Sequence, residues 1–66
     1  MASQNVDELY DTVEEFAAIL VAAELHASGA WEITFTEDIR ASFKRYGPRT
    51  QLSVAQQTQL ERIAKY

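Results

Sequence analysis

The residues with the clearest capacity for chemistry are carboxylates that crowd the beginning of the chain. Five of them fall within nine positions, with no Lys or Arg among them: Asp7, Glu8, Asp11, Glu14 and Glu15. Neighbouring carboxylates can act as an acid and base pair, but only in a shaped pocket that holds a substrate. A chain of 66 residues has room for one small core and little else. These carboxylates therefore favour binding over catalysis.

His26 is the other side chain able to transfer a proton or bind a metal ion. Glu24 lies two positions before it, which on a helix places the two side chains on different sides. The chain has no Cys, no Ser-His-Asp set, no glycine-rich phosphate loop and no ligand spacing typical of zinc. We therefore expect no enzymatic activity, no cofactor and no metal site, and we interpret His26 as a surface residue near a helix end.

Charge is divided sharply along the chain. Residues 1–39 contain nine acids and no Lys or Arg, whereas residues 40–66 contain six bases and the single acid Glu61. Four of the bases lie close together: Arg40, Lys44, Arg45 and Arg49. Such asymmetry between two halves of a chain is typical of proteins that recognise another macromolecule.

An amphipathic helix is predicted to carry the carboxylates. Apolar residues recur at spacings of three and four: Val6, Leu9, Val13, Phe16, Leu20 and Ala23. The pattern predicts one long helix from about Asn5 to Ser28, with Asn5 or Ser3 as its cap and Gly29 just past its end. At about 100° per residue the five acids form one continuous face opposite the apolar stripe. The second half of the helix is apolar over most of its circumference, so we expect the rest of the chain to wrap it.

A short extended connection is predicted over residues 29–35. Trp31, Ile33 and Phe35 alternate with polar residues, which is the period of an extended segment with one apolar face. We expect its aromatic rings to lie over the first helix. A small domain needs its aromatic residues for burial, so the same argument assigns Trp31, Phe35 and Tyr46 to the core rather than to stacking on bases.

Two further helices are predicted in the second half of the chain. One covers about Thr36 to Tyr46, with Thr34 or Thr36 as its cap, and ends where Gly47 precedes Pro48. Ser53 and Gln56 have the spacing of a capping box, which predicts a last helix to about Ala64.

The predicted fold is therefore mainly all-α. It is a single domain over residues 1–66, a compact three-helix domain with a long acidic first helix and a short extended connection. The longest apolar run, Phe16 to Ala23, is far shorter than the roughly 20 residues of a membrane span. Without a signal peptide pattern, we expect a soluble cytoplasmic protein that makes no membrane contact. Its small core leaves both a monomer and a homodimer open.

The acidic face allows three interpretations. It can be a solvated surface stabilised by the helix dipole, a contact with the basic half of the same chain or of a second copy in a dimer, or an imitation of a nucleic-acid backbone. In the last case its partner is a host protein or complex whose cationic groove normally holds DNA or RNA.

The basic set supports a different class of function. Arg40, Lys44, Arg45 and Arg49 could contact phosphates in a small DNA-binding regulatory module. The loop from Gly47 to Ser53 is longer than the turn of a helix-turn-helix, and bases near a helix end also interact favourably with its dipole.

A resemblance to mobile-element proteins adds to this interpretation. The stretch FKRYGPRTQLSVAQQTQLERIA, about a third of the chain, resembles a helical module of phage- and plasmid-encoded proteins of DNA metabolism. Its matching positions are Phe43, Tyr46, Gly47, Thr50, Leu52, Ser53, Gln56, Leu60, Ile63 and Ala64. The small, acidic, cysteine-free character also resembles anti-CRISPR inhibitors, several of which mimic DNA. This resemblance implies a phage-type inhibitor that blocks the target-DNA groove of a CRISPR surveillance complex, best suited to a type I system, in the host cytoplasm.

Overall fold

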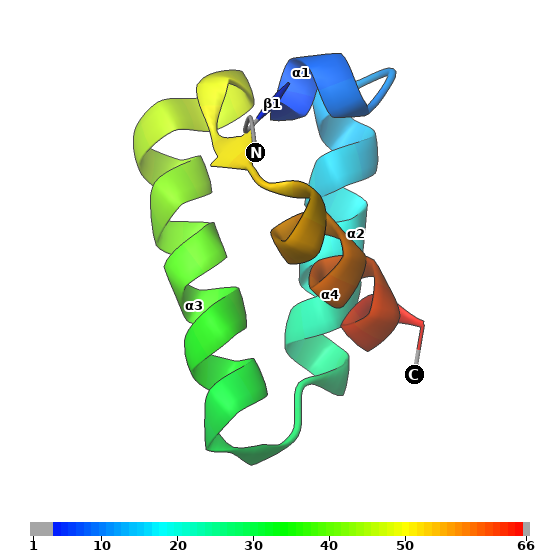
Figure 1. The fold of residues 1–66 in the computed structure, drawn as a ribbon, viewed down its shortest axis with the longest axis vertical. Coiled ribbons are helices and arrows are strands. Elements are labelled where there is room, and N and C mark those ends of the chain that lie inside the picture. The colour runs from blue at the N-terminus through cyan, green and yellow to red at the C-terminus, as the bar shows by residue number, and fades with distance from the viewer. Residues whose placement is uncertain (1–3, 66) are drawn as a thin grey trace.

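Four helices, one 3₁₀ turn and two very short strands make up the computed structural model, which describes residues 4–65 (Figure 1). The helices are α1 (Val6–Leu9), α2 (Val13–His26), α3 (Gly29–Tyr46) and α4 (Val54–Ala64). The 3₁₀ turn is η1 (Gly47–Arg49), and the strands are β1 (Gln4–Asn5) and β2 (Gln51–Leu52). The predicted mainly all-α class is confirmed. Ser3, one candidate cap, lies outside the described residues.

The three long helices form the body of the molecule. Figure 1 shows α2 and α3 running antiparallel side by side, with α4 packed chiefly against α2. β1 pairs with β2 in antiparallel register, Gln4 opposite Leu52 and Asn5 opposite Gln51. The Val6 amide then donates to the Thr50 carbonyl at 2.8 Å. These bonds fasten the beginning of the described chain to the segment that follows α3.

The predicted long first helix is wrong, because the chain leaves the helical conformation between Leu9 and Val13. Tyr10 has extended dihedral angles, φ −129° and ψ 150°. Thr12 then caps α2 by accepting a hydrogen bond from the Glu15 amide at 3.1 Å. The break turns the Tyr10 side chain inward, where it is only 8% exposed. Burial of this large ring and a new N-cap together stabilise the break.

The predicted extended connection over residues 29–35 is also wrong. Only Ala27 and Ser28 separate α2 from α3, and α3 begins at Gly29 with φ +81°. The Ser28 amide donates to the Glu32 carboxylate at 3.0 Å, which satisfies a free donor at the start of the helix.

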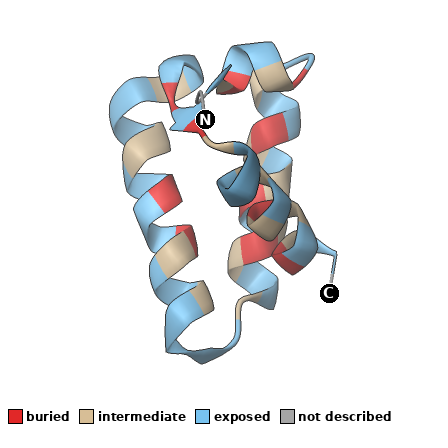
Figure 2. Ribbon diagram, viewed as in Figure 1, coloured by how far each residue is buried: buried red, intermediate tan, exposed pale blue. Residues whose placement is uncertain are grey.

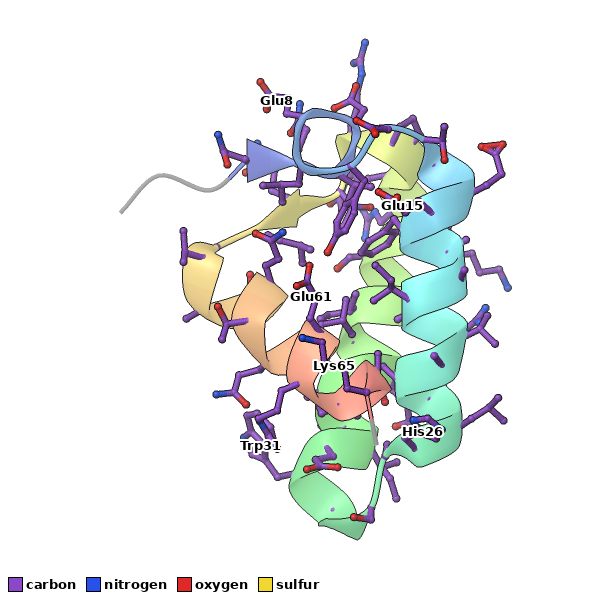
Figure 3. All side chains as sticks on the ribbon, turned by 90° about the vertical axis from the view of Figure 1, so that its right-hand side faces the viewer. Glu8, Glu15, His26, Trp31, Glu61 and Lys65 are labelled. Carbon is purple, nitrogen blue, oxygen red and sulfur yellow. The ribbon has the colours of Figure 1, made fainter. Side chains whose placement is uncertain are left out.

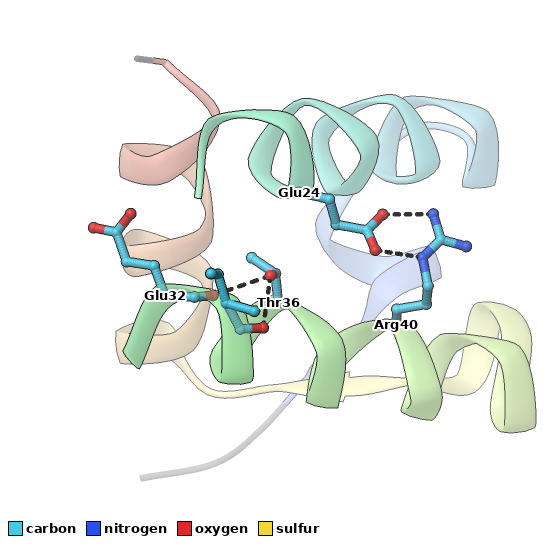
Figure 4. Close-up of polar contacts among 5 residues, drawn as sticks. Glu24, Glu32, Thr36 and Arg40 are labelled. Carbon is cyan, nitrogen blue, oxygen red and sulfur yellow. Dashed lines mark hydrogen bonds and ion pairs between the residues drawn. The ribbon is translucent and has the colours of Figure 1, made fainter. Parts of the chain in front are cut away.

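Thr34 and Thr36, predicted as caps, lie inside α3 instead. The buried Thr36 hydroxyl donates to the carbonyls of Glu32 and Ile33 at 3.0 and 3.1 Å (Figure 4). These bonds to the preceding turn satisfy the buried hydroxyl within the helix itself.

The predicted end of the second helix and the predicted bounds of the last helix are confirmed, whereas the second helix begins seven residues before its predicted start at Thr36. α3 ends at Tyr46, and Gly47 follows with φ +58°. The Ser53 hydroxyl accepts from the Gln56 amide at 3.1 Å, while the Gln56 side chain accepts from the Ser53 amide at 2.9 Å. This reciprocal capping box starts α4 at Val54.

The core lies where α2, α3 and α4 meet beneath α1 (Figure 2). Phe16 is fully buried between two rings, with centroids 5.6 Å from Tyr10 and 5.0 Å from Phe43. The other buried apolar residues are Val6, Leu20, Ala23, Ile39, Leu52, Leu60 and Ile63.

Two predictions about burial are wrong. Trp31 and Tyr46 are 59% and 55% exposed, and only Phe35 of the three assigned aromatic residues packs partly against the core. The second half of α2 is not wrapped either, because Val21 and Leu25 remain 45% and 78% exposed. The molecule therefore exposes more apolar surface to solvent than we predicted from the sequence.

Candidate macromolecule-binding surfaces

The five predicted acidic residues are all exposed and lie near one end of the molecule. Because the first helix is broken, they do not share one helical face. Asp7 and Glu8 lie in the first turn of α1, Asp11 in the linker, and Glu14 and Glu15 in the first turn of α2. Figure 3 shows Glu8 and Glu15 on these two helices. We call this set of five carboxylates the acidic cap.

The break changes how the acidic cap is stabilised. Each helix N-terminus presents free amides and a positive dipole end, so two helix starts favour anions where one long helix would offer only one. The Glu8 carboxylate accepts from the Asn5 amide at 3.0 Å. Between residues 4 and 65 the ion pairs are Arg40 with Glu24 and Arg62 with Glu32, so none involves the acidic cap.

Three of the four predicted basic residues form an exposed group. Lys44 and Arg45 lie in the last turn of α3, and Arg49 is the last residue of η1. The Arg45 guanidinium lies over the exposed Tyr46 ring, 5.5 Å from its centroid. We call Lys44, Arg45 and Arg49 the basic cluster.

Arg40 differs from these three because it has a partner in the chain. It donates from Nε and one terminal nitrogen to the two carboxylate oxygens of Glu24, which joins α3 to α2 (Figure 4). The hydrogen bonds and the negative charge of Glu24 raise the pKa of Arg40. Its guanidinium therefore links two helices and is not free to bind a phosphate.

The acidic cap and the basic cluster lie on adjoining elements at one end of the fold. α1 contacts η1, and the β1–β2 pair runs beside them (Figure 1). The two halves of the chain are tied by the pairs from Glu24 to Arg40 and from Glu32 to Arg62. These pairs use acids outside the cap, so within residues 4–65 the acidic cap makes no ion pair with the basic half of its own chain and keeps its charge toward solvent.

A polar contact that sequence reasoning missed holds the linker of the acidic cap in place. The Tyr10 hydroxyl donates to Glu61 of α4 at 2.8 Å, and the Gln57 side chain donates to the same carboxylate oxygen at 3.3 Å. Burial raises the pKa of Tyr10 to about 12, and the hydrogen bond to Glu61 and its charge act in the same direction. The spacing from Thr12 to Glu15 is a capping-box signature and could have revealed the break that positions Tyr10.

His26 is exposed at the end of α2, where its Nδ1 lies 3.0 Å from the Ala64 carbonyl of α4. Since a carbonyl only accepts, this contact requires the proton on Nδ1. Residues 4–65 contain no group of side chains arranged to hold a metal ion. In the same part of the chain, no helix combines the length and the apolar character needed to cross a bilayer.

Comparisons with protein-family models, with curated proteins and with solved structures found no match to this chain. The fold and its surface define a small helical protein with an exposed acidic cap beside a basic cluster. Its function is therefore inferred from surface chemistry.

Proposed function

We propose that the protein is an inhibitor that presents its acidic cap to the cationic nucleic-acid-binding site of a host protein or complex. One observation carries this proposal. All five carboxylates of the cap are exposed and, within residues 4–65, none forms an ion pair, although three exposed bases lie on adjoining elements. Their charge is thus available to a partner, and bound inhibitor would exclude nucleic acid by competition.

The structure supports a preorganised cap rather than a flexible acidic tail. The linker is fixed by the Thr12 cap on one side and by the contact between Tyr10 and Glu61 on the other. Carboxylates on a fixed backbone lose little conformational freedom when they bind, which favours affinity. A cationic groove would also steer the cap toward it over a distance set by the ionic strength.

The resemblance to anti-CRISPR inhibitors makes the target-DNA groove of a type I surveillance complex the first partner to test. Such a groove binds nucleic acid through the negative charges of the phosphate backbone, and carboxylates can replace those charges. The proposal assigns the protein a binding role without chemistry, cofactor or metal.

The test compares two charge reversals of equal size. Asp7→Lys with Asp11→Lys changes the acidic cap, whereas Glu37→Lys with Asp38→Lys changes two exposed acids of α3 that make no ion pair among the described residues. We expect the cap variant to bind the complex at least about tenfold more weakly, and its loss of affinity to shrink in high salt. The α3 variant controls for net charge. Equal affinities of the two variants would refute the proposal.

A DNA-binding regulatory module is the second candidate, and one specific observation favours it. The exposed Tyr46 ring lies beneath the Arg45 guanidinium and lines one pocket with Arg49, a combination of stacking surface and positive charge that suits nucleic acid. Titration of the full chain with duplex and single-stranded DNA at low salt separates the candidates. Binding that Lys44→Glu with Arg45→Glu abolishes would support this module, and the inhibitor proposal predicts no binding to free DNA.

A further inference from the structure

An apolar face runs along the outer side of α2 and continues into the groove between α2 and α4. Val21 and Leu25 are exposed on it, Leu25 to 78%. The groove is lined by Ala18, Ile19, Ala22 and Ala64, with Glu61 and Lys65 at its edges. Exposed apolar residues on one helix face, joined to an apolar groove, mark a surface that binds another protein.

The residues of this face have the spacing of a helix-packing seam. Glu14, Ala18, Val21 and Leu25 follow one another at intervals of four, three and four, which places them on one side of α2. Small alanines beside larger side chains allow a second helix to approach closely and interlock with the face.

The charges at the two ends of the face have opposite signs. Glu14 and Glu15 lie at the beginning of α2, whereas Lys65 lies at the edge of the groove, toward the other end of the face. Figure 3 shows Glu15 and His26 at opposite ends of α2, with Lys65 between α2 and α4. A surface that is acidic at one end and basic at the other is complementary to its own copy turned end for end.

We propose that this face binds a second copy of the chain, with the two α2 helices antiparallel across a two-fold axis. A two-fold axis places each end of the face against the opposite end of the second copy. Glu15 of each copy then lies beside Lys65 of the other, so this contact forms twice. Antiparallel helices also oppose their dipoles favourably.

The arrangement leaves Asp7, Glu8 and Asp11 outside the contact, because they precede α2. The assembly would carry two acidic caps at opposite ends. With 14 residues, α2 is only about 21 Å long, so the contact is small and the dimer should dissociate in the micromolar range.

Sedimentation equilibrium over a wide range of protein concentration tests the proposal. We expect a reversible dimer that Val21→Gln with Leu25→Gln weakens about tenfold or more, since it removes two apolar contacts per copy. Ile33→Gln with Val54→Gln is the matched control, because these residues are also exposed and apolar but lie elsewhere on the molecule. All four side chains are exposed, so the variants should fold.

A charge exchange tests the antiparallel arrangement. Lys65→Glu alone and Glu15→Lys alone should each weaken the dimer about three- to fivefold, and the two together should restore it. A chain that stays monomeric up to millimolar concentration overturns the proposal, as does a dimer that the Val21 and Leu25 substitutions leave unchanged. Failure of the charge exchange to restore affinity overturns the two-fold geometry.

Discussion

Replacing Tyr10 with Phe removes one buried hydroxyl from the contact between the linker of the acidic cap and α4. In the native protein this hydroxyl donates to Glu61 at 2.8 Å, and the ring that carries it packs on Phe16. Phe retains the ring, so the substitution tests the hydrogen bond and not the packing. A hydrogen bond to a charged group contributes about 1.5–3 kcal/mol.

The expected loss in Tyr10→Phe is smaller than that full value. Glu61 is only half-buried, and both water and the Gln57 side chain can still donate to it. We therefore expect the free energy of unfolding to fall by about 1–2 kcal/mol at neutral pH. In a domain of this size each kcal/mol lowers Tm by about 4–8 °C, which thermal unfolding followed by circular dichroism resolves easily. Tyr46→Phe, which changes an exposed tyrosine, is the control.

The same substitution has a signature at alkaline pH. Folding raises the pKa of Tyr10 from 10.0 to about 12, so the folded state favours the neutral phenol. This contribution to stability is fully present below pH 10 and is lost as the pH rises toward 12. After allowance for solvent screening it amounts to about 1–2 kcal/mol. The unfolding free energies of the native protein and Tyr10→Phe should thus converge between pH 10 and 12.

Two outcomes would refute this reasoning about Tyr10. Equal stability of the native protein and Tyr10→Phe at neutral pH would show that the contact with Glu61 contributes nothing. A constant difference between the two proteins from pH 9 to pH 12 would show that folding does not perturb the phenol.

Two further substitutions test the local geometry at the start of α2 and at the end of α3. Thr12→Ala removes the cap that accepts from the Glu15 amide, so it should lower the free energy of unfolding by about 1 kcal/mol, and hydrogen exchange should show faster opening of the first turn of α2. Gly47→Ala places a Cβ on a residue with φ +58° and ψ −132°; although no neighbouring atom blocks it, backbone strain should lower stability by about 1–3 kcal/mol in denaturant titration. Unchanged exchange in the first variant, or an equal midpoint in the second, would contradict these assignments.

The sequence predicted the end of α3 and the start of α4, where local side-chain and backbone features define the boundaries. The capping box of Ser53 and Gln56 and the stop at Gly47 depend on contacts within a few residues, which a sequence displays directly. The break between α1 and α2 was missed because the apolar spacing from Leu9 to Val13 continues in phase across it. The capping-box spacing from Thr12 to Glu15 was a local sign of the break, whereas the distant contact from Tyr10 to Glu61 that helps to stabilise it has no local pattern.

The error over residues 29–35 has a different cause. Three alternating apolar residues are too few to distinguish the period of a strand from the period of a helix, since Trp31 and Phe35 are also one helical turn apart. In α3 their rings stack with centroids 5.1 Å apart and an interplanar angle of 7°. The size argument failed for Trp31 and Tyr46, because it says that a small domain needs buried rings but does not say which rings they are. Phe16, Tyr10 and Phe43 fill that role.

The break in the first helix bears on the acidic cap in two opposing ways. It places Asp7, Glu8, Glu14 and Glu15 in the first turns of two helices, where the dipole alone gives a reason for acids to occur. Four of the five candidate residues thus have a structural explanation that requires no partner. Asp11 does not share it, because it lies in the linker and belongs to the first turn of neither helix. The inhibitor proposal therefore depends most on Asp11: a loss of partner binding on its reversal, without a loss of stability, is an effect that helix dipoles do not predict.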